Sequence, residues 1–136
     1  MKVIDQESPC LCYSGQPYHK CCQPFHSGKQ LPNPTQLMRS RYCAYALGNL
    51  DYIIQTTHPD NPQIEKSIEL WRKRIQLFCD QTEFVGLQII GDEEGTDMAY
   101  VTFRAGLKQN QKDASFMERS KFLRHDGRWK YHSRVE

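Results

Sequence analysis

The sequence predicts an α+β protein in which three helices pack on a curved antiparallel sheet of about four strands. Residues 33–81 place apolar side chains at the three- and four-residue steps of amphipathic helices, and residues 84–135 change to the two-residue alternation of strands. Residues 1–32 follow neither period and hold four of the six cysteines among turn-forming residues. We therefore expect a small knuckle over residues 1–32 and an α+β domain over residues 33–136.

The first two helices of the larger domain are marked by their ends. Asn33 and Gln36 have the spacing of a capping-box variant, and Gly48 suits the residue that follows a helix. A shorter helix over residues 50–57 has to stop there, because Pro59 restricts the residue before it and cannot continue the hydrogen-bond ladder.

The third helix is predicted to begin at Asn61-Pro62, which repeats the start signal of the first. Its apolar stripe consists of Ile64, Ile68, Trp71, Ile75 and Phe78. Steps of four and three residues place these side chains on one helix face, so this face should pack on the sheet.

The strands follow from Phe84 onward. The alternating apolar sets are Val85, Leu87 and Ile89, then Ala99, Val101, Phe103 and Ala105, followed by an extended run from Ala114 to Arg124 and a last strand with Trp129 and Tyr131. Asp126-Gly127 predicts a two-residue hairpin turn, because a type I′ turn needs positive φ at both positions. A long curved sheet packed on helices can leave a conical cavity, so the predicted geometry permits a ligand pocket.

Composition excludes some classes of function. The chain has 136 residues, 18 basic and 16 acidic, for a net charge of +2, which is too balanced for non-specific nucleic-acid binding. The N-terminus has no apolar segment typical of a signal peptide, and no apolar run approaches the length of a membrane helix. We therefore expect a cytoplasmic protein without a membrane span, in a compartment that keeps thiols reduced.

The four cysteines of the knuckle form the strongest chemical pattern in the sequence. Cys10 and Cys12 are separated from Cys21 and Cys22 by eight residues, a loop long enough to bring the two pairs face to face. Four thiolates suit a closed tetrahedral Zn²⁺ site, and such a short polar segment needs a metal to fold. Two disulfides, a redox dithiol and an iron–sulfur cluster are the alternatives, and the reducing compartment and the spacing favour zinc over them.

The segment Cys10-Leu11-Cys12, Ser14-Gly15 and Tyr18-His19-Lys20-Cys21-Cys22 resembles the SEC-C motif, a zinc-binding segment also found at the C-terminus of the SecA translocase ATPase. Leu11 and Tyr13 depart from the proline and glycine usual in the motif. The resemblance implies that the zinc ligands are Cys10, Cys12, Cys21 and Cys22.

The rest of the chain resembles the bacterial YchJ-like family. Three segments carry this resemblance: residues 37–45, Thr57-His58-Pro59, and residues 118–122 with the sequence ERSKF. It implies that a SEC-C segment precedes a cone-shaped domain similar to nuclear transport factor 2 (NTF2). The resemblance thus implies a fold and a metal, but no activity.

Glu118 is the candidate for chemistry in the cone. Period-two alternation places it on the same face as the aromatic side chains Phe116 and Phe122, where burial would suit a general acid or base. The alternative, which the pairing of most buried charges favours, is a structural ion pair with Arg39 or Arg41 of the first helix.

Three further side chains are weighed alongside Glu118. His58 precedes a proline at a helix end, where an imidazole can cap carbonyl groups or face a pocket. Cys43 and Cys79 fall inside predicted helices and are assigned to packing. The pocket candidates are therefore Glu118, His58 and Arg41.

Three functions remain open from the sequence. The preferred hypothesis is a zinc-binding adaptor whose knuckle docks a protein partner, because the metal ligand set is complete and no catalytic set is. The alternative is a small-molecule-binding protein or an isomerase- or dehydratase-like enzyme that uses the cone around Glu118. The third is an RNA- or ribosome-associated factor that uses the basic last hairpin, namely Arg119, Lys121, Arg124, Arg128, Lys130 and Arg134.

Overall fold

The computed structural model describes residues 1–62, 64 and 67–135 and confirms the α+β class. The knuckle contains the 3₁₀ helix η1 (Tyr18–Lys20) and the short helix α1 (Gln23–His26). The three predicted helices are α2 (Pro34–Leu47), α3 (Leu50–Gln55) and α4 (Ile68–Gln81). The strands are β1 (Thr82–Glu94), β2 (Met98–Gln109), β3 (Lys112–Asp113), β4 (Phe116–His125) and β5 (Arg128–Val135).

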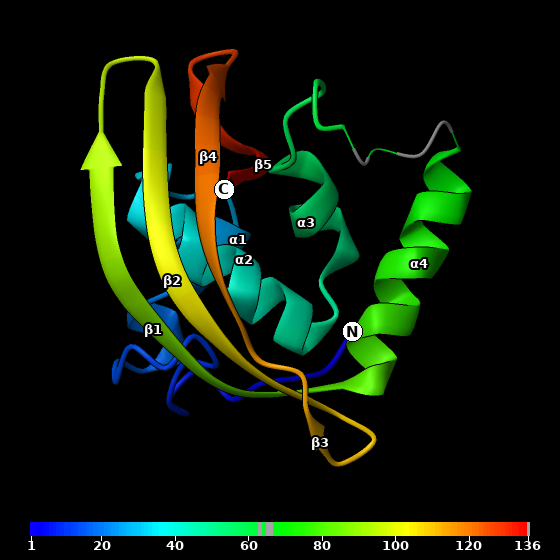
Figure 1. The fold of residues 1–136 in the computed structure, drawn as a ribbon. Coiled ribbons are helices and arrows are strands. Elements are labelled where there is room, and N and C mark those ends of the chain that lie inside the picture. Colours follow the sequence, from blue (N-terminus) through cyan, green and yellow to red (C-terminus); the bar gives the residue numbers. More distant parts are fainter. Residues whose placement is uncertain (63, 65–66, 136) are drawn as a thin grey trace.

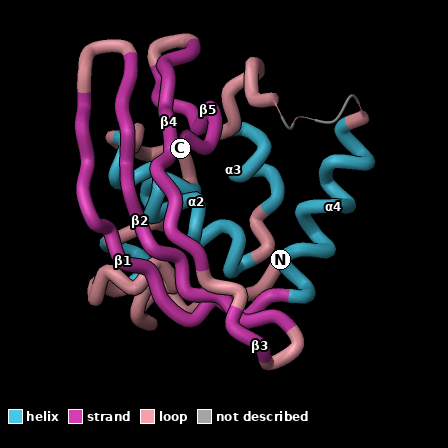
Figure 2. Tube along the Cα trace, in the orientation of Figure 1, coloured by secondary structure: helices cyan, strands magenta, loops and turns pink. Residues whose placement is uncertain are grey.

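The sheet is antiparallel with the order β1-β2-β4-β5, and β3 pairs with β2 beyond this path. Figure 1 shows the long strands β1, β2 and β4 curving as one layer, with α2, α3 and α4 along the concave side. Figure 2 shows the same division between a strand layer and a helix layer. These layers make the cone that the sequence predicts.

Helix α2 begins and ends where the sequence predicts. The Asn33 side chain accepts a hydrogen bond from the Gln36 backbone N–H at 2.8 Å, and the Gln36 side chain accepts one from the Asn33 N–H at 2.9 Å. Gly48 ends the helix at φ 75°, a conformation that glycine adopts without strain. The helix is buried on most sides, because it lies between the knuckle and the sheet.

The predicted start of α4 is wrong. The helix begins at Ile68, where the Ser67 hydroxyl caps the Leu70 N–H, and residues 63 and 65–66 of the predicted helix lie outside the described residues. Asn61 does not act as the N-cap, because its side-chain amide donates to the His132 carbonyl on β5 at 2.8 Å. Ile68 is consequently 61% exposed, whereas Ile75 of the same predicted stripe is buried.

The face predicted for Val85 is also wrong. A β-bulge between Phe84 and Gly86 shifts the register of β1 against β2, so Val85 is exposed while Leu87 is partly buried. A second register shift lies between Ile89 and Gly91, so β1 departs from strict alternation at two places.

Two tight turns join strands. Asp126-Gly127 has φ values of 54° and 76°, as a type I′ turn requires, and confirms the predicted hairpin. Asn110-Gln111 makes a second turn with positive φ at both residues and joins β2 to β3. No glycine marks this turn, so the run predicted from Ala114 onward contains no signal for the short strand before it.

The knuckle packs directly on α2. Its buried core consists of Cys10, Cys12, Tyr18 and Cys22 together with Cys43 and Leu47 of α2. Among the described residues, no helix is long and apolar enough to cross a membrane.

Candidate metal centre and cone cavity

The four cysteines of the SEC-C-like segment meet in space. The Sγ atoms of Cys10, Cys12, Cys21 and Cys22 all lie within 4.8 Å of one another, with Cys12 and Cys21 at 3.4 Å and Cys21 and Cys22 at 3.9 Å. A tetrahedral site with Zn–S bonds of about 2.3 Å needs sulfur atoms about 3.8 Å apart. The observed spacing and the soft donor set therefore fit a zinc ion.

The backbone of the knuckle holds these thiols in place. The Cys10 N–H donates to the Gln16 carbonyl at 2.8 Å, and the Cys21 N–H donates to the carbonyl of Tyr18, the first residue of η1, at 3.0 Å. Tyr13, at the position of a motif glycine, has φ 62°, so the turn keeps the glycine-like conformation without the glycine.

Cys21 is the more exposed member of the set. Hydrogen bonds from Cys22 and then Ser14, whose hydroxyl lies 3.1 Å from Cys21 Sγ, lower the pKa of the Cys21 thiol to about 7. A low pKa favours the thiolate, which is the form that binds a metal.

All six cysteines are free thiols, and two of them lie outside this set. Cys79 is buried in the core of the cone, where burial raises its pKa to about 11, as expected for a packing residue. Cys43 is also fully buried, but its Sγ lies 3.8 Å from Cys10 Sγ. Cys43 therefore contacts the cysteine cluster from α2, which its sequence position does not reveal.

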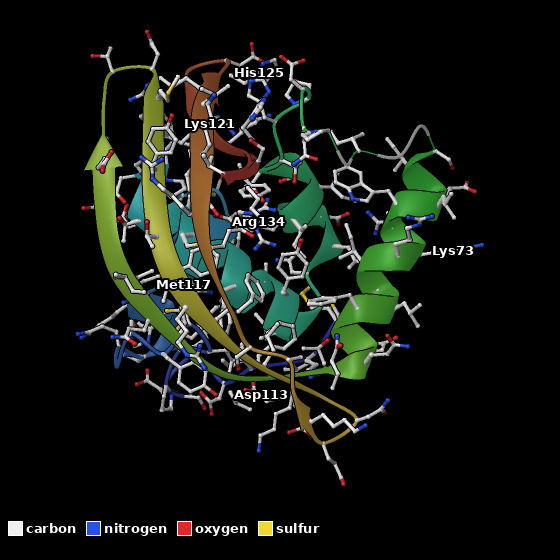
Figure 3. The ribbon with its side chains drawn as sticks, viewed as in Figure 1. Lys73, Asp113, Met117, Lys121, His125 and Arg134 are labelled. Carbon is white, nitrogen blue, oxygen red and sulfur yellow. The ribbon has the colours of Figure 1, made fainter. Side chains whose placement is uncertain are left out.

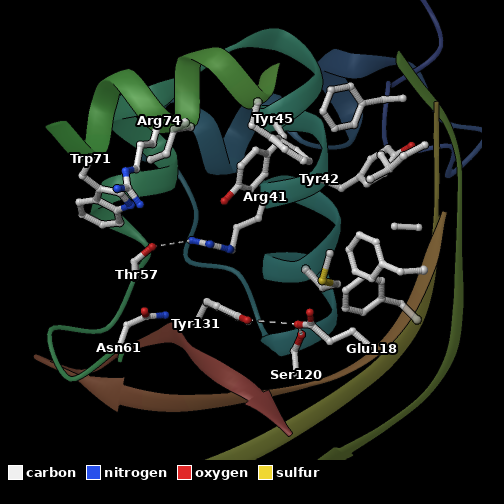
Figure 4. A pocket seen from close by; sticks show the side chains of 18 of the residues that line it. Arg41, Tyr42, Tyr45, Thr57, Asn61, Trp71, Arg74, Glu118, Ser120 and Tyr131 are labelled. Carbon is white, nitrogen blue, oxygen red and sulfur yellow. Dashed lines mark hydrogen bonds between the residues drawn. The ribbon is translucent and has the colours of Figure 1, made fainter. Parts of the chain in front are cut away.

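The cone holds a cavity of about 750 Å³ between the sheet and the helices, and this cavity is open to solvent on one side. Figure 4 shows its charged and hydroxyl-bearing side chains converging from α2, α4, β4 and β5. The polar lining consists of Arg41, Tyr45, Thr57, Asn61, Arg74, Glu118, Ser120 and Tyr131. The apolar lining includes Met38, Phe78, Phe84, Phe103, Leu107 and Phe116. The cavity is thus amphipathic, as binding sites for small organic molecules commonly are.

Glu118 lies in this cavity, on the same face of β4 as Phe116. Its Oε2 accepts hydrogen bonds from the Ser120 hydroxyl and, at 3.2 Å, from the Tyr131 hydroxyl. Among the ion pairs of the described residues, none joins Glu118 to an arginine, so the expected pairing with Arg39 or Arg41 is not formed. Arg39 instead donates to the Cys12 carbonyl in the knuckle at 3.1 Å.

Arg41 is the buried cation of the cavity. Its Nη1 donates to the Ile53 carbonyl and to the hydroxyls of Thr56 and Thr57 at 2.8 to 3.1 Å. The guanidinium lies 4.7 Å from the centre of the Tyr131 ring, in cation–π contact. These contacts fix Arg41 at the end of α3, and they satisfy backbone and side-chain oxygens there.

His58 is placed beside the cavity rather than in its lining. Its backbone N–H donates to the Tyr131 carbonyl at 2.7 Å, and its Nδ1 accepts from the Asp60 N–H at 3.0 Å. The imidazole packs edge-on against His125 and His132, with ring centres 5.4 and 5.5 Å away. His58 therefore fixes the chain after α3 on β5, and within the described part of the chain its ring caps no helix carbonyl.

The basic last hairpin is partly engaged within the protein. Arg119 lies over the Tyr100 ring and pairs with Glu93, and Arg124 lies over Trp129 and donates to the Thr96 carbonyl. A nucleic-acid interface on this surface stays a prediction.

Comparisons with known proteins define first a class and then a family. Among solved structures, a SEC-C motif containing protein from Rhodopseudomonas palustris superposes with a TM-score of 0.82 at 31% identity, covering 94% of this chain and 98% of that one. Another from Psychrobacter arcticus gives 0.72 at 23% identity, covering 96% and 81%. The chain is therefore of the class in which a SEC-C segment precedes an NTF2-like domain.

The family follows from sequence. The family model described as "YchJ, middle NTF2-like domain" matches residues 33–134. UPF0225 proteins from Actinobacillus succinogenes and Deinococcus radiodurans are 42% and 41% identical, and the matches cover 88% and 90% of this chain and 77% and 85% of theirs. The chain belongs to the YchJ family.

One more distant structure shares the fold alone. A putative ketosteroid isomerase from Shewanella frigidimarina superposes with a TM-score of 0.54 at 17% identity, covering 72% of this chain and 89% of that one.

Proposed function

We propose that this protein binds a small organic molecule in the cone cavity and that its knuckle carries a structural zinc ion. The cavity carries the proposal, because it holds about 750 Å³ between aromatic walls and a polar end with Arg41 and Glu118. A space of this size suits a ligand of ordinary metabolite dimensions. An isomerase- or dehydratase-like reaction at Glu118 remains the enzymatic form of the same proposal.

The proposed zinc ion has a structural role and takes no part in catalysis. A site closed by four thiolates has no open coordination position for substrate. Cys10, Cys12 and Cys22 are buried, and the segment around them is too short to fold on an apolar core of its own. Such a thiol site also supports a cytoplasmic location, where thiols stay reduced.

Binding in the cavity can be tested with the fluorescent apolar probe 1-anilinonaphthalene-8-sulfonate and with competing small molecules. Ala105 lies on β2 in the cavity lining and is 2% exposed, so Ala105→Phe should fill the space and abolish probe binding. Ala105→Val adds less volume and should weaken binding by less, which separates filling from misfolding.

Lys73→Gln is the matched surface control, because Lys73 points away from the molecule in Figure 3. The proposal fails if the probe binds wild type and Ala105→Phe equally well, or if the folded wild-type protein binds no probe at all.

A second candidate is the adaptor role, in which the knuckle docks a protein. It is supported by a hollow of about 430 Å³ beside the metal centre, lined by His19, Lys20, Cys21, Cys22, Pro24, Phe25, Gln30, Gln36 and Arg39. Its basic side chains suit an acidic partner. Proteins captured from a bacterial lysate by wild type should be lost with Cys21→Ser/Cys22→Ser, and an unchanged set after metal loss would contradict this role.

A further inference from the structure

We infer that the polar end of the cone cavity recognises a free α-amino acid with an apolar side chain. The inference rests on the proposed binding function of the cavity and names the chemical class of its ligand. It follows from two opposite charges that the protein holds apart within one cavity.

Glu118 supplies the negative side. Both hydrogen bonds that it accepts from described residues end on Oε2, one from Ser120 and one from Tyr131. Its Oε1 accepts none among the described residues, and Figure 4 shows the carboxylate at the edge of the open space. A ligand that binds here has to donate hydrogen bonds, and an ammonium group does so with the complementary charge.

Arg41 supplies the positive side. Its hydrogen bonds to Ile53, Thr56 and Thr57 all leave from Nη1. The other two nitrogens of the guanidinium are left for the cavity and for Tyr45, whose pKa burial raises and the nearby Arg41 lowers in part. A guanidinium edge of this kind is suited to a carboxylate group.

Tyr131 keeps the two charges apart. The face of its ring lies under Arg41, while the hydroxyl at the end of the ring donates to Glu118. The ring therefore spaces the guanidinium from the carboxylate, and the two do not form an ion pair. Among the described residues, neither the buried Arg41 nor the partly buried Glu118 forms an ion pair, and a zwitterion satisfies both charges at once.

The remaining walls define the body of the ligand. Phe84, Phe103 and Phe116 line the sheet side of the cavity, and Met38 and Phe78 line the helix side. These side chains favour an apolar or aromatic side chain, because burying such a group there removes apolar surface from water. A polar amino acid would lose its own hydration without a partner on these walls.

Isothermal titration calorimetry of the zinc-loaded protein with three matched probes tests the inference. L-Phenylalanine carries both charges, 3-phenylpropionate lacks the ammonium group, and 2-phenylethylamine lacks the carboxylate. We expect L-phenylalanine to bind about tenfold or more tightly than either analogue, because each analogue leaves either Arg41 or Glu118 without a partner of opposite charge.

Two variants assign the contacts. Glu118→Gln should remove the preference for L-phenylalanine over 3-phenylpropionate and keep the preference over 2-phenylethylamine. Arg41→Lys keeps the charge but loses the fork of donors, and should reduce the preference over 2-phenylethylamine. Lys73→Gln should change neither ratio.

The outcomes separate this inference from the proposed function. Equal binding of the three probes, or tighter binding of an analogue, would overturn the amino-acid class while the cavity still binds ligands. Binding of 1-anilinonaphthalene-8-sulfonate without any binding of L-phenylalanine would also overturn it. Binding of no probe at all would overturn both.

Discussion

The knuckle and the cone differ in what fills their interiors. The knuckle closes on four sulfur atoms that lie within 4.8 Å of one another, whereas the cone holds a cavity of about 750 Å³ with charged groups inside. The short segment has no apolar core large enough to hold it, which is why we propose that it binds a structural metal ion. The larger domain has a hydrophobic core of its own, which includes the fully buried Phe122, Leu37 and Val101. The closed thiol cluster of the knuckle is suited to stabilising the fold, and the open cavity of the cone is available for a ligand.

The largest difference between the two regions is expected when the metal is removed, because the knuckle should unfold and the cone should stay folded. Cys12→Ser is expected to abolish zinc binding and unfold the knuckle, because Cys12 is fully buried and a structural zinc site contributes about 10 kcal/mol or more. Metal content by mass spectrometry and backbone NMR spectra of the knuckle measure the loss.

Cys79→Ser is the matched control, because Cys79 is a buried thiol in the cone core. It should keep zinc and lose only part of the stability of the cone. A folded knuckle in metal-free Cys12→Ser would contradict the division between the two regions.

Within the cone, Arg41 should matter for stability as well as for the ligand. Arg41→Met removes the donor to two threonine hydroxyls and one of the donors to the Ile53 carbonyl, so we expect a loss of about 2–4 kcal/mol in the free energy of unfolding. Urea denaturation measures it.

Arg72→Met, which removes an exposed pair with Asp51, should cost at most about 1 kcal/mol. Equal costs for the two variants would show that Arg41 has no special place in the fold.

The contact between the regions should be sensitive to pH through His26. Its Nε2 donates to the Ser40 carbonyl and its Nδ1 accepts from the Tyr18 hydroxyl, and burial lowers the pKa of this imidazole. The unfolded chain therefore binds more protons, so the stability is present above the ordinary value of 6.5 and is lost as the pH falls below it. The slope from this one group reaches at most about 1.4 kcal/mol per pH unit.

Denaturation at pH 7.5 and at pH 5.5 measures this effect. His26→Gln, which keeps a donor and an acceptor but does not titrate, should show a shallower decrease. The same decrease in wild type and variant would assign the acid sensitivity to other groups, such as His132, whose pKa is also lowered by burial.

The smallest effect on the free energy of unfolding is expected at the exposed contact between the knuckle and β1. Tyr13 of the knuckle donates from its hydroxyl to the Phe84 carbonyl on β1 at 2.8 Å, and the side chain is half exposed. Tyr13→Phe should cost about 0.5–1 kcal/mol. Tyr100→Phe, a change inside the sheet, is the comparison, and a much larger effect at Tyr13 would mean that the regions depend on each other more than their interiors suggest.

Local signals predicted most of the fold. The capping box at Asn33, the end at Gly48 and the turn at Asp126-Gly127 depend on neighbouring residues only, so each was readable from the sequence and is confirmed. The start of α4 was not predictable from neighbouring residues, because the Asn61 amide donates to a carbonyl on β5 and Ser67 caps the helix instead. The bulge at Val85 depends on the partner strand, which the alternation of one strand does not contain.

The candidate site also has some features that the sequence predicted and others that it did not. The cysteine spacing indicated which thiols meet, and period-two alternation placed Glu118 on the inner face of β4. The partners of Glu118 come from β5 and from two residues along β4, and Cys43 reaches the metal centre from α2. Contacts of this kind depend on how distant segments pack, so the sequence predicted an ion pair where the structure has a tyrosine.

The bulge of β1 has a consequence for how this fold can diversify. At this point the strands come so close that a Cβ on Gly106 would lie 3.0 Å from the Gly86 nitrogen. The Tyr42 hydroxyl of α2 donates to the Gly106 carbonyl and accepts from the Gly86 N–H, both at 3.1 Å. This side chain of a helix therefore bridges the two strands at the bend of the sheet. A side chain at Gly106 would therefore force the two strands to shift, and with them the wall of the cone, whereas a Cβ on Gly86 meets nothing within 4 Å. The shape of the cone thus depends in part on Gly106, a position that carries no side chain.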